Sequence, residues 1–522
     1  MRKKFNFRFL LLLVAGIVMS LNAMAQSQTI KGHVQDQDGQ PIAFASVVLL
    51  DTRAVVNTDA NGFFTLTAAP GAAVRVSYLG YKTVETKATD NMLVVLEDNN
   101  TLEEAVVIGY GVVKKNDLTG SVTAIKPDEK NHGMITNAQD MIQGKIAGVA
   151  VTSDGGSPGG GANIRIRGGS SLNASNNPLI VIDGLAMDQS GVKGLSNPLS
   201  MVNPEDIETF TVLKDASATA IYGSRGSNGV IIITTKKGRV DQKPKVTYNG
   251  YVSLSTRQKG IDVLDADEYR NFITDYYGAD SDAAGKLGPL TGKGTDWQDK
   301  IYRLAFSHDH NVTISGGVKN MPYRFTLGYT DQEGILKTSD FERYTAGMNL
   351  NPSFLQEHLK FNLSAKFMHA NTRYANTGAI SSAVRFDPTQ TVRSDNANYD
   401  NFDHYFQWIK SGSDLHDPTW PYTYERNSMP NPVALLNQYD NHAKSQSFIG
   451  NIEADYQIHG FEDLRLHANF GADFSKGRQE TTESPYSANS AYYGWDGWEK
   501  EDKYNLSFNA YAQYYKPQIR NL

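Results

Sequence analysis

The residues most suggestive of catalysis in this sequence form a short glycine-rich segment, Gly155-Gly156-Ser157-Pro158-Gly159. It matches the G-x-S-x-G pattern of a hydrolase, in which the residue after the serine donates its backbone N–H to the oxyanion. Here that residue is Pro158, which has no N–H, and no helical pattern follows it. The segment also lacks the Gly-Lys-Ser/Thr of a phosphate loop, so it predicts a plain glycine loop.

Other candidate sites are equally incomplete. Asp36-Gln37-Asp38-Gly39 resembles the start of a calcium loop without its closing glutamate, so a hairpin turn is the better interpretation. His308 and His310 fit either a metal pair on one strand face or an ordinary loop-to-strand junction, and the sequence places no third ligand. Carboxylate spacings single out no glycosidase pair, and cysteine is absent. We therefore expect no catalytic residue, metal or cofactor, and no enzyme activity.

The N-terminus predicts export. Residues 1–25 combine a cationic start, an apolar core from Phe9 to Met19 and a small-x-small site, with cleavage expected between Ala25 and Gln26. Removing the segment changes the formal charge from −6 to −10, which argues against nucleic-acid binding. No later apolar run approaches the roughly 18 residues of a spanning helix. If the mature chain crosses a membrane, it does so with strands.

Residues 26–98 predict a small immunoglobulin-like or transthyretin-like β-sandwich, because short β-rich runs alternate with turn signals such as Asn61-Gly62. These runs are Thr29–Val34, Ala45–Leu50, Phe63–Thr67, Val74–Tyr78 and Met92–Leu96. A linker over 99–117 follows and contains the apolar run Ala105–Gly111. Such a run is suited to adding as a strand to a partner's sheet, although an ordinary edge strand is the alternative.

Residues 118–238 mix strand and helix signals and predict an α+β globule. Asn163–Arg167 alternates with both arginines on one face, and Leu179–Ile182 is a buried-strand run that ends in Asp183-Gly184. Asp215 can cap a helix through Ala216–Tyr222 that the next glycines stop. A strand is expected over Gly229–Lys237.

From residue 239 to 522 the pattern changes to long runs with a period of two, apolar and aromatic on one face and polar on the other. The eight runs begin near 245, 311, 323, 344, 359, 448, 464 and 504. Connections between them alternate between short and longer, as in barrels with periplasmic turns and extracellular loops. A part of a transmembrane antiparallel β-barrel is predicted. Eight strands would leave no lumen for a globule of this size, so we expect the chain to be truncated.

Several segments resemble the SusC/RagA-type TonB-dependent transporters of the outer membrane. Leu102–Gly111 is similar to their TonB box, whose residues here are Glu104, Ala105, Val106, Val107, Ile108 and Gly109. Ile164–Gly168, Leu179–Gly184 and Val212–Ile231 resemble their plug signatures. The plug-motif residues are Arg165, Arg167, Gly168, Asp183, Gly184, Asp215, Tyr222, Gly223, Arg225 and Gly226. Residues 26–98 look like the family's carboxypeptidase-regulatory-like domain. The chain departs in length, since family members are about twice this size with a 22-strand barrel.

The resemblance implies energised import of oligosaccharides or peptides across the outer membrane, with TonB in the periplasm and a SusD-like surface lipoprotein as partners. On this view Arg165 and Arg167 would pair with acidic residues of the barrel. Aromatic residues between 372 and 447, among them Trp408, Trp420 and Tyr422, are candidates for contact with a glycan, the lid or neighbouring loops.

Two alternatives remain open. The first is a siderophore-type or signalling receptor. This hypothesis is less favoured, because a sandwich over 28–98 differs from the βαβ fold of a signalling domain. A secreted, non-transporting glycan-binding or adhesion protein would be soluble, whereas barrel strands require detergent.

Overall fold

The computed structural model describes residues 28–36, 39–52, 54–59, 61–78, 81, 83–97, 105–108, 111–114, 122–125, 135, 137–153, 155–169, 172–173, 175–188, 190–195, 198–215, 219–240, 242–411, 422–489 and 493–514. The chain divides into two compact units, Met1–Val106 with Val112–Lys115, and Val107–Gly111 with Asn116–Leu522. The expected signal peptide, with Ala25 and Gln26, lies outside the described residues. Within these ranges, no helix is long and apolar enough to cross a membrane.

The first unit is a small sandwich of seven strands with a single core. Its strands are β1 (Gln28–Asp36), β2 (Ser46–Leu49), β3 (Val55–Asn57), β4 (Phe63–Ala68), β5 (Ala73–Ser77), β6 (Val84–Lys87) and β7 (Met92–Leu96). They form two sheets, ordered β4-β1-β7 and β3-β2-β5-β6. Alternate side chains such as Ile30, Val47 and Leu66 fill the space between the sheets. The five predicted strands are present, and the two that were missed are short and largely exposed.

The second unit contains a mixed domain built on a five-stranded sheet of order β10-β15-β16-β13-β14. Its strands are β10 (Val122–Ile125), β13 (Leu179–Ile182), β14 (Leu185–Ala186), β15 (Ile207–Leu213) and β16 (Val230–Thr235), beside a separate hairpin of β11 (Val149–Ser153) and β12 (Ala162–Ile166). Strands β13 and β16 run parallel, and the other pairs of the sheet are antiparallel. β13 is apolar throughout and β16 is apolar over its first four residues, because both faces of these strands are covered.

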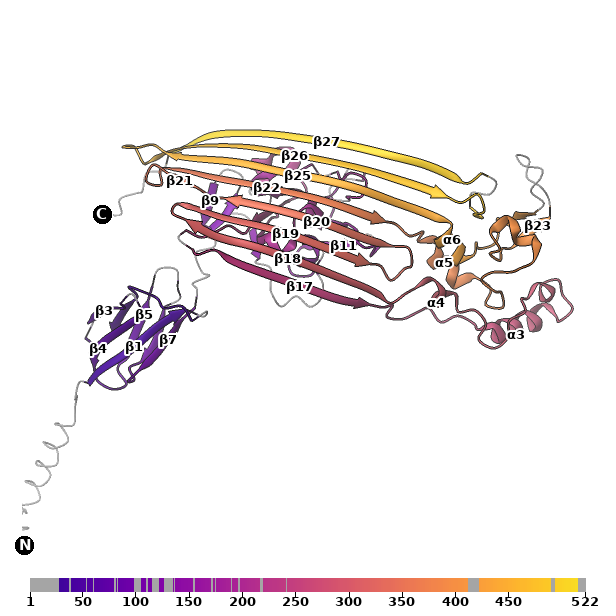
Figure 1. Ribbon diagram of the computed structural model, residues 1–522, viewed down its shortest axis with the longest axis horizontal. Helices are drawn as coiled ribbons and strands as arrows, with labels where there is room; N and C mark the ends of the chain where they lie inside the picture. The colour runs from indigo at the N-terminus through magenta and orange to yellow at the C-terminus, as the bar shows by residue number, and fades with distance from the viewer. Residues whose placement is uncertain are drawn as a thin grey trace, which may run out of the picture. The chain divides into compact units, whose positions relative to one another are not determined.

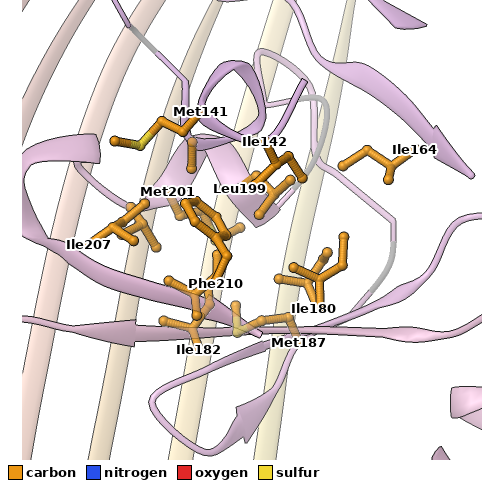
Figure 2. Close-up of a cluster of buried hydrophobic side chains, with 14 of the residues drawn as sticks. Met141, Ile142, Ile164, Ile180, Ile182, Met187, Leu199, Met201, Ile207 and Phe210 are labelled. Atoms are coloured by element: carbon orange, nitrogen blue, oxygen red, sulfur yellow. The ribbon is translucent and has the colours of Figure 1, made fainter. Parts of the chain in front are cut away.

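The core of this domain lies between the sheet and three short 3₁₀ helices, η2 (Ala138–Met141), η3 (Pro198–Met201) and η4 (Pro204–Asp206). Figure 2 shows Ile142, Leu199 and Met201 of the helical side gathered around Phe210 and Ile182 of the sheet. The same cluster includes Phe341, Met368, Ala370 and Ile449. Since those four residues belong to the long strands described next, the domain does not have a closed core of its own.

The helix predicted over Ala216–Tyr222 is described only in part, because residues 216–218 lie outside the described residues, while the Thr219 N–H donates to the Asp215 carbonyl at 3.1 Å. The structure has a 3₁₀ helix, η5 (Ala220–Gly226), and Gly223 inside it adopts φ 59°. The predicted stop signal therefore lies within the helical segment and kinks it, because glycine reaches this left-handed conformation without a Cβ clash.

Eight long strands form an antiparallel sheet in which each pairs with its neighbour along the chain (Figure 1). They are β17 (Lys245–Ser255), β18 (Ala305–Val318), β19 (Met321–Glu333), β20 (Asp340–Leu350), β22 (Leu359–Arg373), β25 (Tyr439–Gln457), β26 (Leu464–Glu483) and β27 (Trp495–Tyr514). A two-residue strand, β21 (Ser353–Phe354), adds to β22. Each of the eight predicted runs overlaps one of these strands, and most strands continue beyond the predicted runs.

The two faces of this sheet have the opposite polarity to those of a soluble protein. One face exposes large apolar side chains, for example Leu327, Phe448 and Phe508. The other face packs against the mixed domain and carries buried polar residues, for example Asn311, Thr330 and Ser447. Apolar groups outside and polar groups inside are the arrangement of a barrel wall with lipid on one side and an aqueous or polar interior on the other.

The long connections carry the helices, which gather beyond one end of the sheet (Figure 1). Residues 256–304 contain α3 (Ala266–Tyr277) and α4 (Trp297–Ile301), and residues 374–438 contain α5 (Gly378–Arg385) and α6 (Pro432–Asn437). α4, α5 and α6 share an apolar core that includes Trp297, Phe386 and Leu435. If the sheet is interpreted as part of a barrel, the end with the helices is the extracellular end, because the tight turns that join the strands at the other end are typical of the periplasmic side.

The reversed polarity predicts how Phe470→Arg behaves. Phe470 is 47% exposed in the middle of the apolar stretch of β26, so in a bilayer the arginine should cost about 2–4 kcal/mol. The free energy of unfolding in phospholipid vesicles measures this effect. As a matched control, Val55→Arg changes a water-facing sandwich residue that is 58% exposed, and a cost within about 0.5 kcal/mol is expected. Equal costs for both variants would contradict the lipid-facing assignment.

Candidate functional site: the interface between the plug and the sheet

A buried ion pair joins the mixed domain to the inner face of the sheet. The Asp183 carboxylate contacts the Lys366 ammonium of β22, and the side chains are only 5% and 7% exposed. Asp183 also accepts hydrogen bonds of 2.8 Å from both the backbone N–H and the hydroxyl of Thr235. A buried charge requires such compensation, so each partner is needed to keep the other in place.

Local backbone geometry presents the Asp183 side chain. Asp183 and Gly184 form the tight turn between β13 and β14, with φ 46° and 88°. Aspartate tolerates this left-handed region better than most residues, and glycine adopts it freely. The Asp183 carbonyl accepts a further hydrogen bond of 2.8 Å from Asn451 of β25. The turn therefore contacts two strands of the sheet at once.

The charge state of the pair follows from its surroundings. Burial alone would raise the pKa of the Asp183 carboxyl, but Lys366 and the hydrogen bonds from Thr235 hold that pKa below its ordinary value of 3.8. The stabilisation from the lowered pKa is therefore fully present above that value and is lost as the pH falls through the folded-state pKa. At neutral pH the Asp183 carboxyl is therefore ionised.

A second group of contacts surrounds η4. The Asp206 carboxylate lies 3.2 Å from the Arg324 guanidinium and accepts a 2.7 Å hydrogen bond from Thr326, both on β19. Asn203 caps η4 by accepting from the Glu205 N–H, and its amide also donates to Thr345 of β20 at 3.2 Å. Polar side chains from two strands therefore hold the start of β15.

A third group lies at the other edge. Lys193 pairs with Glu499 of β27 at 2.5 Å, and its backbone N–H donates to Glu501 at 3.0 Å. Lys503 of the same strand donates to the Gly191 carbonyl at 2.6 Å. The mixed domain is thus tethered to strands from β19 to β27 by polar groups. Such contacts can break and re-form in water, unlike a continuous apolar core.

The predicted plug-motif residues lie in different surroundings. Arg165 is exposed on β12, and Arg167 pairs with Asp215 of the same domain. Arg167 lies just beyond the end of β12 and is paired within its own domain. The pairing of Arg165 and Arg167 with acidic residues of the barrel stays a prediction. Arg225 donates to the Met187 carbonyl at 2.6 Å, which ties η5 to the turn after β14.

The glycines and the tyrosine of the motifs act through the backbone and packing. Gly168 has φ 102° immediately after Arg167. A Cβ at Gly226 would lie 2.8 Å from the Thr219 carbonyl, so only glycine fits that close approach. Tyr222 packs against the cluster formed by Leu179, Val181 and Val230.

The aromatic residues of the 374–438 connection mostly serve packing. Trp408 packs against the loop core, with its ring centroid 5.3 Å from that of Phe406. Trp420 and the Tyr422 side chain lie outside the described residues. A cleft of about 870 Å³ opens beside this core, between the 256–304 connection and α5, and is lined by residues such as Arg257, Tyr269 and Arg385.

The expected TonB box is described only in part. Ala105–Ile108 forms β8, which pairs with β9 (Gly111–Lys114) as an isolated two-stranded sheet. Glu104 and Gly109 lie outside the described residues, and nothing is described of the β8 side chains.

The histidine pair is not at a loop junction. His308 and His310 lie within β18 on the apolar face, and the His310 ring stacks on Tyr248. Among the described residues, no group of three or more potential ligands is arranged to hold a metal.

Sequence reasoning missed the groups of the sheet that hold the plug, namely Lys366, Arg324, Asn451 and Lys503. A signal was present, because each occupies a polar position of an alternating run. Alternation cannot tell which polar residue meets a partner, since that depends on the register between strands distant in sequence.

The comparisons with known proteins agree with this architecture. Residues 114–230 match the TonB-dependent Receptor Plug Domain family, and residues 30–108 match the CarboxypepD_reg-like domain family. The TonB-dependent receptor SusC of Bacteroides thetaiotaomicron is 55% identical over 98% of this chain and 51% of its own length. TonB-dependent receptor P26 of Formosa agariphila is 33% identical over 90% of this chain and 45% of its own. The chain spans about half the length of these curated relatives.

Among solved structures, the RagAB peptide importer in its closed-closed state matches with a TM-score of 0.60 at 23% identity, over 76% of this chain and 45% of that one. This likeness concerns the fold alone. A plug domain held against the polar face of a barrel wall defines a TonB-dependent receptor. With nearly all of its length similar to SusC, the chain belongs to the SusC/RagA-type TonB-dependent receptors.

The buried pair generates a testable prediction. Asp183→Asn leaves Lys366 buried without its counter-charge, which should weaken the attachment of the plug by about 3–5 kcal/mol. The sequence has no cysteine, so Ser447→Cys, placed beneath Met201, provides a single thiol that reagents reach only when the plug moves. The labelling rate should rise in the Asp183→Asn background.

Two controls accompany this measurement. Lys366→Met added to Asp183→Asn removes the unpaired charge and should restore slow labelling. Arg75→Ala breaks an exposed pair with Glu85 in the first unit and should leave the rate unchanged. If Asp183→Asn labels no faster than the parent protein, the pair does not hold the plug.

Proposed function

We propose that this protein belongs to a system for active, TonB-dependent import of oligosaccharide or peptide nutrients across the outer membrane, and that it is not an enzyme. One observation carries the proposal, namely a plug attached by polar contacts to the inner face of a sheet whose outer face is apolar. A wall of this kind separates lipid from a hydrophilic path, and the plug blocks that path. Kinship with SusC-type receptors supports the same reading.

In the proposed mechanism, TonB adds as a strand to the segment around Val106, Val107 and Ile108 from the periplasmic side. Isolated pairing of β8 with β9 supports this role, because edge strands accept further strands. A pull on this segment transmits force to the plug. The sheet of the plug is bound to the wall through contacts such as Asp183–Lys366, which then carry that force. Water can replace these polar partners as they separate, which lowers the cost of moving the plug.

We further propose a SusD-like lipoprotein as the partner at the extracellular end. A solved structure with a similar fold is the RagAB peptide importer. The helical connections form a packed platform at this end of the strands, and the 870 Å³ cleft beside α5 gives the platform a recessed polar surface. Trp420 and Tyr422 remain candidates for contact with the lid or with cargo.

A secreted, non-transporting adhesion protein is the alternative from another class. It would require the apolar face of the sheet to be covered by protein instead of lipid. Membrane fractionation separates the two, since a barrel wall stays in the outer membrane until detergent releases it.

Deleting residues 104–109 in the full receptor should abolish uptake of labelled cargo while surface binding of that cargo persists, because only the link to TonB is lost. A finer variant is Val107→Pro, which removes one backbone N–H and should reduce uptake at least tenfold. Val107→Thr keeps that N–H and is the matched control, for which uptake near the parent level is expected. Normal uptake after the deletion would refute the coupling role of this segment.

A further inference from the structure

On the outer face of the sheet, the apolar stretches of three neighbouring strands end at a band of charged and polar side chains that contains four cations. The outward residues are apolar along 448–456 of β25, 466–474 of β26 and 504–514 of β27. Each stretch has the length of about 9–11 residues that a tilted strand needs to cross a bilayer. Towards the extracellular end, the next outward residues are Gln446 on β25 and Asp502 on β27, and the band also holds four cations, namely Lys444, Lys476, Arg478 and Lys500. We call these four residues the cationic patch.

Three members of the cationic patch stand directly opposite one another. Lys444 is the cross-strand partner of Arg478, and Arg478 is the partner of Lys500. Like charges in directly paired positions repel and destabilise a sheet. Two acids offset four cations only in part. Glu480 lies 2.6 Å from Arg478, and Asp502 lies 2.8 Å from Lys500 and directly opposite Lys476. The patch therefore retains a net positive charge that an external anion would neutralise.

A shallow hollow of about 350 Å³ lies beside the patch. Its lining includes Lys444, Arg373 and His442, together with the carboxylates of Asp340 and Asp440. Cations suit a phosphate, and carboxylates accept hydrogen bonds from hydroxyl groups. A phosphorylated sugar offers both kinds of group in one molecule.

We propose that the cationic patch binds the phosphorylated sugar headgroup of a glycolipid in the outer leaflet of the membrane. The inference rests on the proposed membrane location. Continuity with the apolar stretches identifies the occupant, because a molecule seated on the patch extends its other end along Phe448, Phe474 and Tyr504. A lipid has acyl chains for that surface, whereas a soluble acidic protein does not.

The test uses the receptor purified from outer membranes in detergent. Native mass spectrometry measures its binding of three probes, namely phosphorylated lipid A, dephosphorylated lipid A and inorganic phosphate. Each cation near a membrane surface contributes favourable free energy to the binding of an anionic lipid headgroup. The parent protein should therefore prefer the phosphorylated lipid at least tenfold. The triple variant Lys444→Gln, Arg478→Gln, Lys500→Gln should lose that preference.

The control is the triple variant Lys286→Gln, Lys300→Gln, Lys319→Gln, which removes the same charge from exposed positions elsewhere and should keep the preference. Replacing Lys444 and Lys500 by arginine keeps the charge and should also keep it, which guards against a folding defect. Equal binding of both lipids by the parent protein would overturn the proposal, as would inorganic phosphate binding as tightly as the lipid. A receptor that still imports cargo but shows no lipid preference refutes this inference alone, whereas a water-soluble receptor refutes the proposed function.

Discussion

Backbone pairing is the constraint from which the rest of this structure follows. Hydrocarbon offers no partner for a peptide N–H or C=O, so strands in a bilayer must satisfy these groups against one another. The eight strands from β17 to β27 do so through a continuous antiparallel ladder. Because side chains alternate along every strand, one face of the ladder then meets lipid and the other faces inward. The reversed polarity of the sheet is a direct consequence.

The inward polar face determines how the plug is held. A plug joined to the wall by a large apolar interface would be expensive to move, since exposed apolar surface costs free energy in proportion to its area. Most contacts here are ion pairs and hydrogen bonds, such as Asp183–Lys366 and Asp206–Arg324, with a smaller apolar contribution from Phe341, Met368, Ala370 and Ile449. This combination places the plug specifically against the wall, and in the proposed mechanism water would replace its polar partners as the plug moves.

The outward face carries its own organisation. Apolar residues end at the cationic patch on β25 to β27, and the helical connections with their packed core lie beyond it. In the proposed membrane location, the apolar stretches would meet hydrocarbon, the cationic patch would meet lipid headgroups, and the helical connections would meet the external medium. The proposed transport, lid contact and lipid binding would therefore involve different parts of one structure.

The sequence by itself determined the class of fold and the nature of each strand face. A period of two over eight long runs can be satisfied only by strands, and the apolar residues of those runs required a lipid or protein cover. Plug motifs such as Leu179–Gly184 identified the family. Short elements such as β3 and β6 were missed because three or four residues carry too little periodicity.

Only the tertiary structure decided which polar residues meet. Arg167 turned out to pair with Asp215 in its own domain, while Lys366, separated by 183 positions from Asp183, holds the plug to the wall. The row of Lys444, Arg478 and Lys500 likewise depends on the register of three strands. The physical reason is that periodicity fixes the side of a strand on which a residue lies, whereas strand register and domain docking fix which residue lies opposite.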